Sequence, residues 1–192
     1  MDAVVVYHLN ASEGQLTPQA EVKVPGGAQG PRHLKFSPDG RFAYVLNELS
    51  LNLARFAIDP SNGSLRYLES TPLFDDSIAP EGMSAAEIRV HPDGTKLYTS
   101  TRDLTQAQRD LLSTFTLHAD GSIERIAQTP AAVSIPRNFN VDPSGQWLVV
   151  GGQRSRDLAV FRIHPETGIP ELSQSGIAFD GEPICFEWAH IQ

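Results

Sequence analysis

The sequence has little of what disulfide-stabilised, metal-thiolate or membrane proteins contain. Its one cysteine, Cys185, cannot form an intrachain disulfide, and a cysteine-based zinc site would lack the usual number of ligands. No apolar run approaches the roughly 18 residues of a membrane span. The first apolar cluster, residues 3–7, has no basic segment before it and is too short for a signal peptide. These absences predict a cytoplasmic protein that does not act in a membrane.

Positive charge is also scarce. The chain of 192 residues has 15 lysines and arginines against 23 aspartates and glutamates, which gives a net charge of -8. Because no cationic segment offsets this charge, broad nucleic-acid binding has no electrostatic support. No glycine-rich loop joins a strand to a helix, and no histidine pair has the spacing of metal ligands, so we predict neither a cofactor nor a metal site. Any anion site must be built locally.

Three similar turn sequences divide the chain at intervals of roughly 50 residues. They are Ser37-Pro38-Asp39-Gly40, His91-Pro92-Asp93-Gly94 and Asp142-Pro143-Ser144-Gly145. Apolar residues alternate on both sides of each turn, which is typical of a β-hairpin. A second hairpin is marked by an aromatic residue shortly before a glycine, in four copies: Tyr7 to Gly14, Phe56 to Gly63, Phe115 to Gly121 and Phe161 to Gly168.

Two hairpins per repeat make a four-stranded antiparallel unit, and radial repetition of such units is a β-propeller. We therefore predict an all-β, incomplete β-propeller with three full blades and a partial blade at each end. The expected full blades are residues 29–76, 77–130 and 131–176, and the expected remnants are residues 1–28 and 177–192. The alternative is an all-β sandwich whose turns are similar by coincidence.

Some segments depart from the repeat. Residues 104–112 have capping-box spacing at Thr105 and Gln108, but we interpret them as a loop insertion that interrupts the third outer hairpin. Residues 184–190 are predicted to be a lone inner strand. Trp147, Trp188 and Cys185 are expected to lie in the apolar core of the blades.

The repeat also places polar residues at equivalent positions of successive blades. The residues eight positions before each inner-turn glycine are Arg32, Ala86 and Arg137. The residues eight positions after it are Glu48, Arg102 and Gln153. The residues seven positions before it are His33, Glu87 and Asn138. Equal offsets predict that the first two sets stand opposite one another at the end remote from the turn, at one mouth of the central channel.

These residues are predicted to form a local cationic pocket with carboxylates in an otherwise acidic protein. Three arginines suit a small anion better than a neutral ligand, because guanidinium groups form charge-assisted hydrogen bonds with anionic oxygens. The alternative is that they are ordinary solvated strand ends, which are polar in any propeller.

The inner hairpins resemble those of a known family. Residues 30–34 read Gly-Pro-Arg-His-Leu and are followed by the turn at 37–40 and by Asn-Glu-Leu at 47–49. Residues 85–102 and 136–153 look like the two blades that follow. Over essentially its whole length, the chain resembles the carboxyl-terminal half of the seven-bladed β-propeller lactonase family. That family includes the bacterial propeller 6-phosphogluconolactonases and the fungal carboxymuconate-lactonizing enzyme.

The resemblance implies which residues form the site. Arg32, Glu48 and Arg102 match the active-site arginine, glutamate and second arginine proposed for the family. A further family histidine lies in an earlier blade, outside this sequence. Family members usually have asparagine directly before the second arginine, where this chain has Thr101.

We therefore expect a lactonase-like hydrolase that acts on a small anionic lactone such as 6-phosphogluconolactone. Glu48 is the candidate general base, and Arg32 and Arg102 are the candidate donors to the substrate anion or oxyanion. His33 is a weaker acid-base candidate. The expected substrate-binding residues are Glu87, Arg137, Asn138 and Gln153.

Two other functions remain open at this point. One is a muconate-type lactonizing enzyme, which would run the related reaction at the same site. The other is a catalytically inactive propeller fragment or scaffold that associates with itself or with a complementary half. Open sheet edges favour pairing with another chain, so this alternative predicts a homo-oligomer through the open edges of the propeller.

Overall fold

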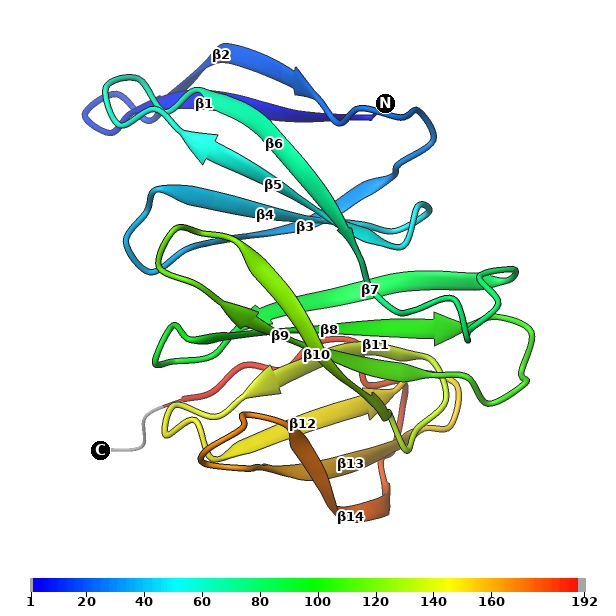
Figure 1. Ribbon diagram of the computed structural model, residues 1–192. Coiled ribbons are helices and arrows are strands. Elements are labelled where there is room, and N and C mark those ends of the chain that lie inside the picture. Colours follow the sequence, from blue (N-terminus) through cyan, green and yellow to red (C-terminus); the bar gives the residue numbers. More distant parts are fainter. Residues whose placement is uncertain (1, 190–192) are drawn as a thin grey trace.

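The computed structural model describes residues 2–189, and Figure 1 shows its strands in successive layers. At the N-terminal end, β1 (Ala3–Asn10) and β2 (Gln15–Lys23) form an antiparallel pair. Three four-stranded antiparallel sheets follow along the chain. No helix long and apolar enough to cross a membrane occurs in the described range.

Each four-stranded sheet consists of two consecutive hairpins whose strands are paired in sequence order. The first sheet contains β3 (Pro31–Phe36), β4 (Phe42–Asn47), β5 (Asn52–Ile58) and β6 (Leu65–Pro72). The second contains β7 (Met83–Val90), β8 (Lys96–Asp103), β9 (Leu111–Leu117) and β10 (Ile123–Pro130). The third contains β11 (Pro136–Val141), β12 (Trp147–Gly152), β13 (Asp157–Ile163) and β14 (Pro170–Ala178).

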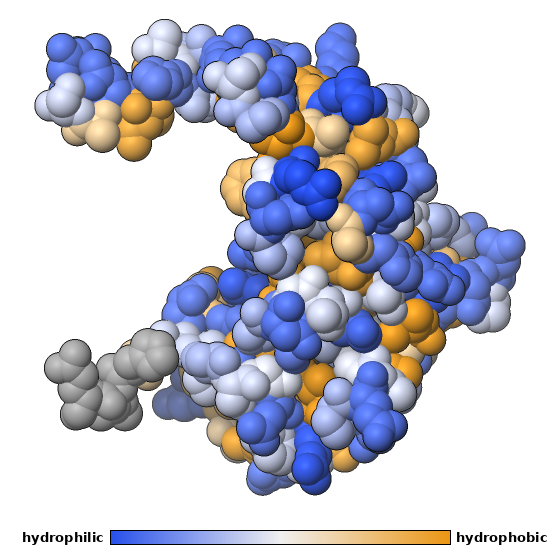
Figure 2. All heavy atoms as spheres, turned by 60° about the vertical axis from the view of Figure 1, so that its left-hand side comes forward, coloured by the Kyte–Doolittle hydropathy of each residue, from blue (hydrophilic) through white to orange (hydrophobic). Residues whose placement is uncertain are grey.

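This arrangement confirms the predicted all-β propeller of four-stranded antiparallel blades with incomplete ends. Each inner turn closes on a glycine in the left-handed region, with φ of 71° at Gly40, 76° at Gly94 and 74° at Gly145. Glycine adopts this conformation without the steric cost that a Cβ atom imposes. Figure 2 shows that the blades curve around a hollow on one side of the molecule.

Apolar side chains between neighbouring sheets form the core. One cluster joins Leu46 and Leu53 of the first full blade to Phe115 of the second. Tyr44 crosses the same boundary and donates a hydrogen bond from its hydroxyl to the carbonyl of Gly121, at 2.8 Å. Tyr98 does the same between the second and third blades, with the carbonyl of Gly168 at 2.9 Å. The blades are therefore connected by buried polar contacts as well as by apolar packing.

Three residues that we expected in the core lie at the surface. Trp147 is 38% exposed, Trp188 is 45% exposed, and Cys185 is exposed. Trp147 alternates along β12 with Leu148, which points into the core between the last two blades. Because side chains of a strand alternate between faces, Trp147 lies on the opposite face, which no further sheet covers within residues 2–189.

Two segments outside the regular sheets refine the sequence-based expectations. Residues 104–110 form a loop and not a helix, which agrees with the prediction. This loop connects β8 to β9, however, and so it does not interrupt the outer hairpin that β9 and β10 form. The loop closes around the buried carboxylate of Asp103, which accepts hydrogen bonds from Thr105 and Arg109. The expected strand at 184–190 is wrong for residues 184–189, which belong to no strand, and His190 lies outside the described residues.

Candidate active site

An irregular register at the start of each inner hairpin determines where the predicted site residues point. The pairing shifts between Pro31 and His33, between Ala85 and Ile88, and between Pro136 and Asn138. Bulges of this kind bend a strand and re-aim its side chains, and they are frequent beside active sites. Arg102 consequently pairs with Ser84 and not with Ala86. Arg32 and Arg137 fall within the shifts and have no partner in the register, so the equal-offset pairing that we predicted is wrong in all three hairpins.

Glu48 and Arg102 come from different blades and meet as an ion pair. Arg102, at the end of β8, is 6% exposed, and its Nη2 donates hydrogen bonds to Oε1 of Glu48 and to the hydroxyl of Ser84. The same nitrogen lies 3.1 Å from the carbonyl oxygen of Ala85. Ser84 also donates to Oε1 of Glu48, at 3.1 Å. The carboxylate of Glu48 is thus held by two donors of the next blade.

Arg32 joins the pair from the bulge in β3. Its Nε lies 3.6 Å from Oε2 of Glu48, and its Nη1 donates to the carbonyl of Ala86. Burial lowers the pKa of Arg32, and the nearby charge of Arg102 acts in the same direction. Two guanidinium groups therefore flank one carboxylate, an arrangement that leaves net positive charge for an anionic ligand.

The residues seven positions before each inner-turn glycine form a continuous row across three blades. Nδ1 of His33 lies 2.9 Å from Oε1 of Glu87, a carboxylate whose side chain is 3% exposed. The amide of Asn138 donates to Oε2 of Glu87. Asn138 in turn accepts a hydrogen bond from the backbone N–H of Phe186, at 3.0 Å. Nη1 of Arg32 lies 3.0 Å from the His33 ring, so this row reaches the arginine and glutamate cluster.

Arg137 and Gln153 occupy the same region but take no part in these contacts. The charge of Arg137 acts to lower the pKa of Arg32, after the larger effects of burial and of Arg102. Among residues 2–189, the Arg137 side chain has no hydrogen bond or ion pair. Gln153 donates to Glu182 at 3.0 Å. With Arg102 and Glu182, it lines a surface pocket of about 380 Å³.

Charge sets the protonation state of the two site carboxylates. Burial acts to raise the pKa of Glu48, but the hydrogen bond and charge of Arg102 outweigh it and hold the pKa below its usual value. Burial acts in the same way on Glu87, but the hydrogen bonds from His33 and from the backbone of Ile88, together with the charges of His33 and Arg89, outweigh it, so the pKa of Glu87 is lowered too. Both groups are therefore carboxylates at neutral pH, able to accept a proton or orient a donor.

Sequence reasoning missed several contributors to the site. Ser84 and the carbonyl groups of Ala85 and Ala86 hold the two arginines, and the backbone of Phe186 completes the row beyond Asn138. Serine and alanine occur in many strands, so the sequence does not indicate that Ser84, Ala85 and Ala86 bind the two arginines. Glu182 could have been found, because it is a carboxylate directly before a proline, at the place where Gly30 precedes Pro31 in the first blade.

Metal chemistry receives no support from the described part of the chain. Among its histidine, cysteine, aspartate and glutamate side chains, no group of three or more is arranged to hold a metal ion. That neither a metal nor a cofactor is needed stays a prediction. The arrangement instead provides a carboxylate, an imidazole and buried guanidinium groups, which can move a proton and stabilise negative charge on a substrate oxygen.

The fold and this cluster define a class of protein, a β-propeller in which arginines and a glutamate of neighbouring blades meet as ion pairs. Residues 1–188 match the family described as lactonase, seven-bladed β-propeller. The chain belongs to this lactonase family, as its inner hairpins indicated. It spans about half the length of the curated relatives that it matches.

Relatives and solved structures support the same placement. The chain is 36% identical to a 6-phosphogluconolactonase of Erwinia tasmaniensis over 174 residues, which are 88% of this chain and 48% of that protein. A putative 6-phosphogluconolactonase of Bacteroides uniformis superposes with a TM-score of 0.82 at 28% identity, over 96% of this chain and 50% of the other. The periplasmic gluconolactonase of Pseudomonas aeruginosa superposes with a TM-score of 0.80 at 30% identity, over 94% and 50% of the two chains.

Proposed function

We propose that this chain carries the catalytic cluster of a lactonase that hydrolyses a small anionic lactone, with 6-phosphogluconolactone as the first substrate to test. The observation that carries the proposal is the meeting of Arg32, Glu48 and Arg102 from neighbouring blades. The names of the Erwinia and Bacteroides relatives support the same reaction and the same phosphorylated sugar lactone.

The geometry supports a division of roles. Glu48 accepts a proton from the attacking water, which adds to the lactone carbonyl carbon. The negative charge that develops on the carbonyl oxygen is stabilised by Arg102 and Arg32. When the ring C–O bond breaks, the leaving alkoxide takes a proton from Glu48 or from His33, and the product is the open hydroxy acid. Glu87 and Asn138 orient His33, and Arg137 and Gln153 are the residues that we propose to contact the distal anionic group.

The test is a hydrolysis assay with 6-phosphogluconolactone, corrected for spontaneous ring opening. Glu48→Gln removes the proton acceptor while it keeps the size of the side chain, and we expect a loss of about 100-fold or more in kcat. Glu69→Gln is the matched control, because Glu69 forms a half-exposed ion pair with Arg55 on the first full blade, away from this cluster. Hydrolysis no faster than the spontaneous reaction, or a Glu48→Gln protein with full activity, contradicts the proposal.

The same assay includes muconolactone, because a muconate-type lactonizing enzyme would use a similar anionic ring. Faster turnover of muconolactone than of 6-phosphogluconolactone would favour this second reaction. The cytoplasmic location that we predicted also stays a prediction, since the Pseudomonas relative is periplasmic by its name.

An association surface is the second candidate function. On β1 the side chains of Val5, Tyr7 and Leu9 lie on one face and are 40%, 51% and 57% exposed. Leu16, the neighbour of Leu9 across the strand pair, is 63% exposed. This apolar face supports self-association through the open end of the propeller. Sedimentation at several concentrations tests this self-association. Leu9→Glu should shift the chain toward monomer, and the control Leu172→Glu, at an exposed site on β14, should not. A wild-type chain that is monomeric at all concentrations would contradict self-association.

A further inference from the structure

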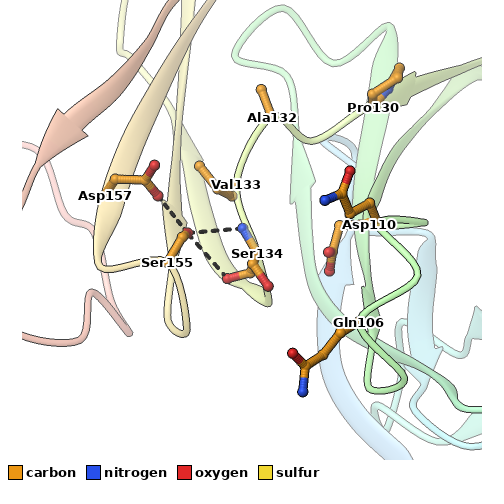
Figure 3. Close-up of a pocket in the computed structure, with 9 residues that line it drawn as sticks. Gln106, Asp110, Pro130, Ala132, Val133, Ser134, Ser155 and Asp157 are labelled. Carbon is orange, nitrogen blue, oxygen red and sulfur yellow. Dashed lines mark hydrogen bonds between the residues drawn. The ribbon is translucent and has the colours of Figure 1, made fainter.

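A second pocket lies on the outer side of the arginine cluster, between the last two blades. It has a volume of about 500 Å³ and is formed by three connections: the β8–β9 loop, the β10–β11 loop and the β12–β13 turn. Figure 3 shows Ser134, Ser155 and Asp157 on one side of this pocket, and Asp110 and Gln106 on the other. Residues 134–135 and 154–155 separate it from the 380 Å³ pocket beside Arg102. The proposed hydrolysis uses none of its side chains.

One carboxylate faces this space with unused hydrogen-bonding capacity. Asp110 is 7% exposed, and its Oδ1 accepts hydrogen bonds from the backbone N–H groups of Asp103 and Ile135. Its Oδ2 has no hydrogen-bond partner among residues 2–189. Burial raises the pKa of this carboxyl above its usual value. Oδ2 is not among the buried unpaired side-chain atoms of the described residues, so it is open to the pocket, where water or a ligand can donate a hydrogen bond to it.

The opposite wall is held in place by contacts of its own. The Ser155 hydroxyl donates to Oδ1 of Asp157 and accepts from the backbone N–H of Ser134, at 2.9 Å. Behind them lies Gly152, where an added Cβ atom would collide with Ser155, Val133 and Asp157. Glycine at this position therefore permits the close approach that fixes the Asp157 carboxylate.

The backbone around the pocket adopts unfavourable conformations at non-glycine residues. Gln106, Gln108 and Ala132 line the pocket with φ of 66°, 58° and 56°, and Ile135 and Arg156 beside it have φ of 59° and 56°. Strained residues of this kind cluster at functional sites, where the surrounding structure maintains them. Two of these residues, Gln106 and Gln108, carry amide side chains and line the pocket together with Asp110 and Asp157.

The chemistry of the wall selects the ligand. Two carboxylates and no basic side chain disfavour an anion, in contrast to the arginine pocket next to it. The glutamine amides add hydrogen-bond donors to the wall. A hydroxyl group of a ligand can accept from these donors, whereas a purely cationic ligand has no acceptor for them. Pro130, Ala132 and Val133 provide an apolar strip against which a C–H face can pack. We propose that this pocket binds a neutral polyhydroxylated ligand of the size of a monosaccharide, through Asp110, Asp157 and the amides of Gln106 and Gln108.

The test is a titration of the isotope-labelled full chain with D-glucose, followed by amide NMR shifts. We expect saturable shifts at Ser134, Ser155 and the glutamine side chains, at millimolar concentrations. D-gluconate at the same concentrations should leave these signals unchanged, because its carboxylate faces Asp110 and Asp157. This readout does not depend on lactone hydrolysis, so its failure and the failure of the proposed enzyme activity are distinguishable.

Two variants locate the binding, and amide NMR of each variant also reports whether it is folded. Gln108→Gly removes one amide and suits the positive φ, and Asp157→Ala removes one carboxylate; each should weaken D-glucose binding about tenfold, the ratio that corresponds to about 1.4 kcal/mol. Ala28→Gly, at another positive φ, and Asp180→Ala, at an exposed carboxylate, are the matched controls and should bind like the wild type.

Three outcomes would overturn the proposal. The first is the absence of shifts at this pocket with D-glucose. The second is equal binding of D-gluconate there. The third is binding of protonated D-glucosamine or of Ca²⁺ at these residues without binding of D-glucose, which would make the pocket a cation site.

Discussion

Replacement of Arg102 by alanine tests the site and the fold at the same position. The guanidinium is 7% exposed as a side chain, and its Nη2 holds Glu48, Ser84 and the carbonyl of Ala85. Removal of one partner from a fully buried ion pair costs about 3–5 kcal/mol. Glu48 is 34% exposed, so water can partly replace the lost partner, and we expect a smaller loss of about 2–3 kcal/mol in the free energy of unfolding.

The effect on activity should be larger than the effect on stability. Loss of one donor to a developing oxyanion typically lowers kcat by about 100-fold to 1000-fold. Urea denaturation measures the first quantity, and 6-phosphogluconolactone hydrolysis by the folded variant measures the second. Arg66→Ala, at an exposed arginine of β6, is the control and should change neither by much. A folded Arg102→Ala protein with the wild-type hydrolysis rate would refute the assignment of Arg102 to the reaction.

The remaining predictions concern stability. Tyr44→Phe should lower the free energy of unfolding by about 1–3 kcal/mol in thermal or urea denaturation, because the buried carbonyl of Gly121 loses its donor; an unchanged midpoint would contradict this. Gly121→Ala should destabilise far more than Gly14→Ala, since both have positive φ but only at Gly121 would the new Cβ atom collide with the Phe42 ring; equal losses would show that the backbone alone matters. Acidification should weaken the fold as Glu48 is protonated, because the pKa of Glu48 is lower in the folded chain than its usual value of 4.5. The contribution of Glu48 to the free energy of unfolding is therefore complete above pH 4.5 and is lost as the pH falls through the lower pKa of the folded chain. A Glu48→Gln protein should show a flatter dependence of unfolding free energy on pH in this range, and the same slope in both proteins would contradict the ion-pair account.

Much of the fold could be read from the repeat alone. The turns that end on Gly40, Gly94 and Gly145 indicate hairpins because glycine is the residue that adopts positive φ at no steric cost, and alternation on both sides indicates strands. The spacing of these turns then predicts four-stranded units, which the sheets confirm. The surface exposure of Trp147 and Cys185 could not be predicted from the repeat, because the burial of a side chain depends on which face of its strand or segment has a neighbouring sheet.

The candidate site was predictable in membership but not in pairing. Counting from the turns found Arg32, Glu48 and Arg102, and these side chains do converge. It paired Arg102 with Ala86, whereas the strand register pairs Arg102 with Ser84. A bulge adds residues to one strand only, so an offset counted along the chain no longer equals a position across the sheet.

By itself, therefore, the sequence determined the strands, their grouping into blades and the residue types at the channel mouth, because turn chemistry and side-chain alternation act over a few neighbouring residues. Only the tertiary structure decided that Glu48 pairs with an arginine of the next blade, and that Asp110 and Asp157 face each other across a pocket. These contacts join residues far apart in the chain, and their geometry depends on the bulges and on the packing of one blade against another, which no local pattern records.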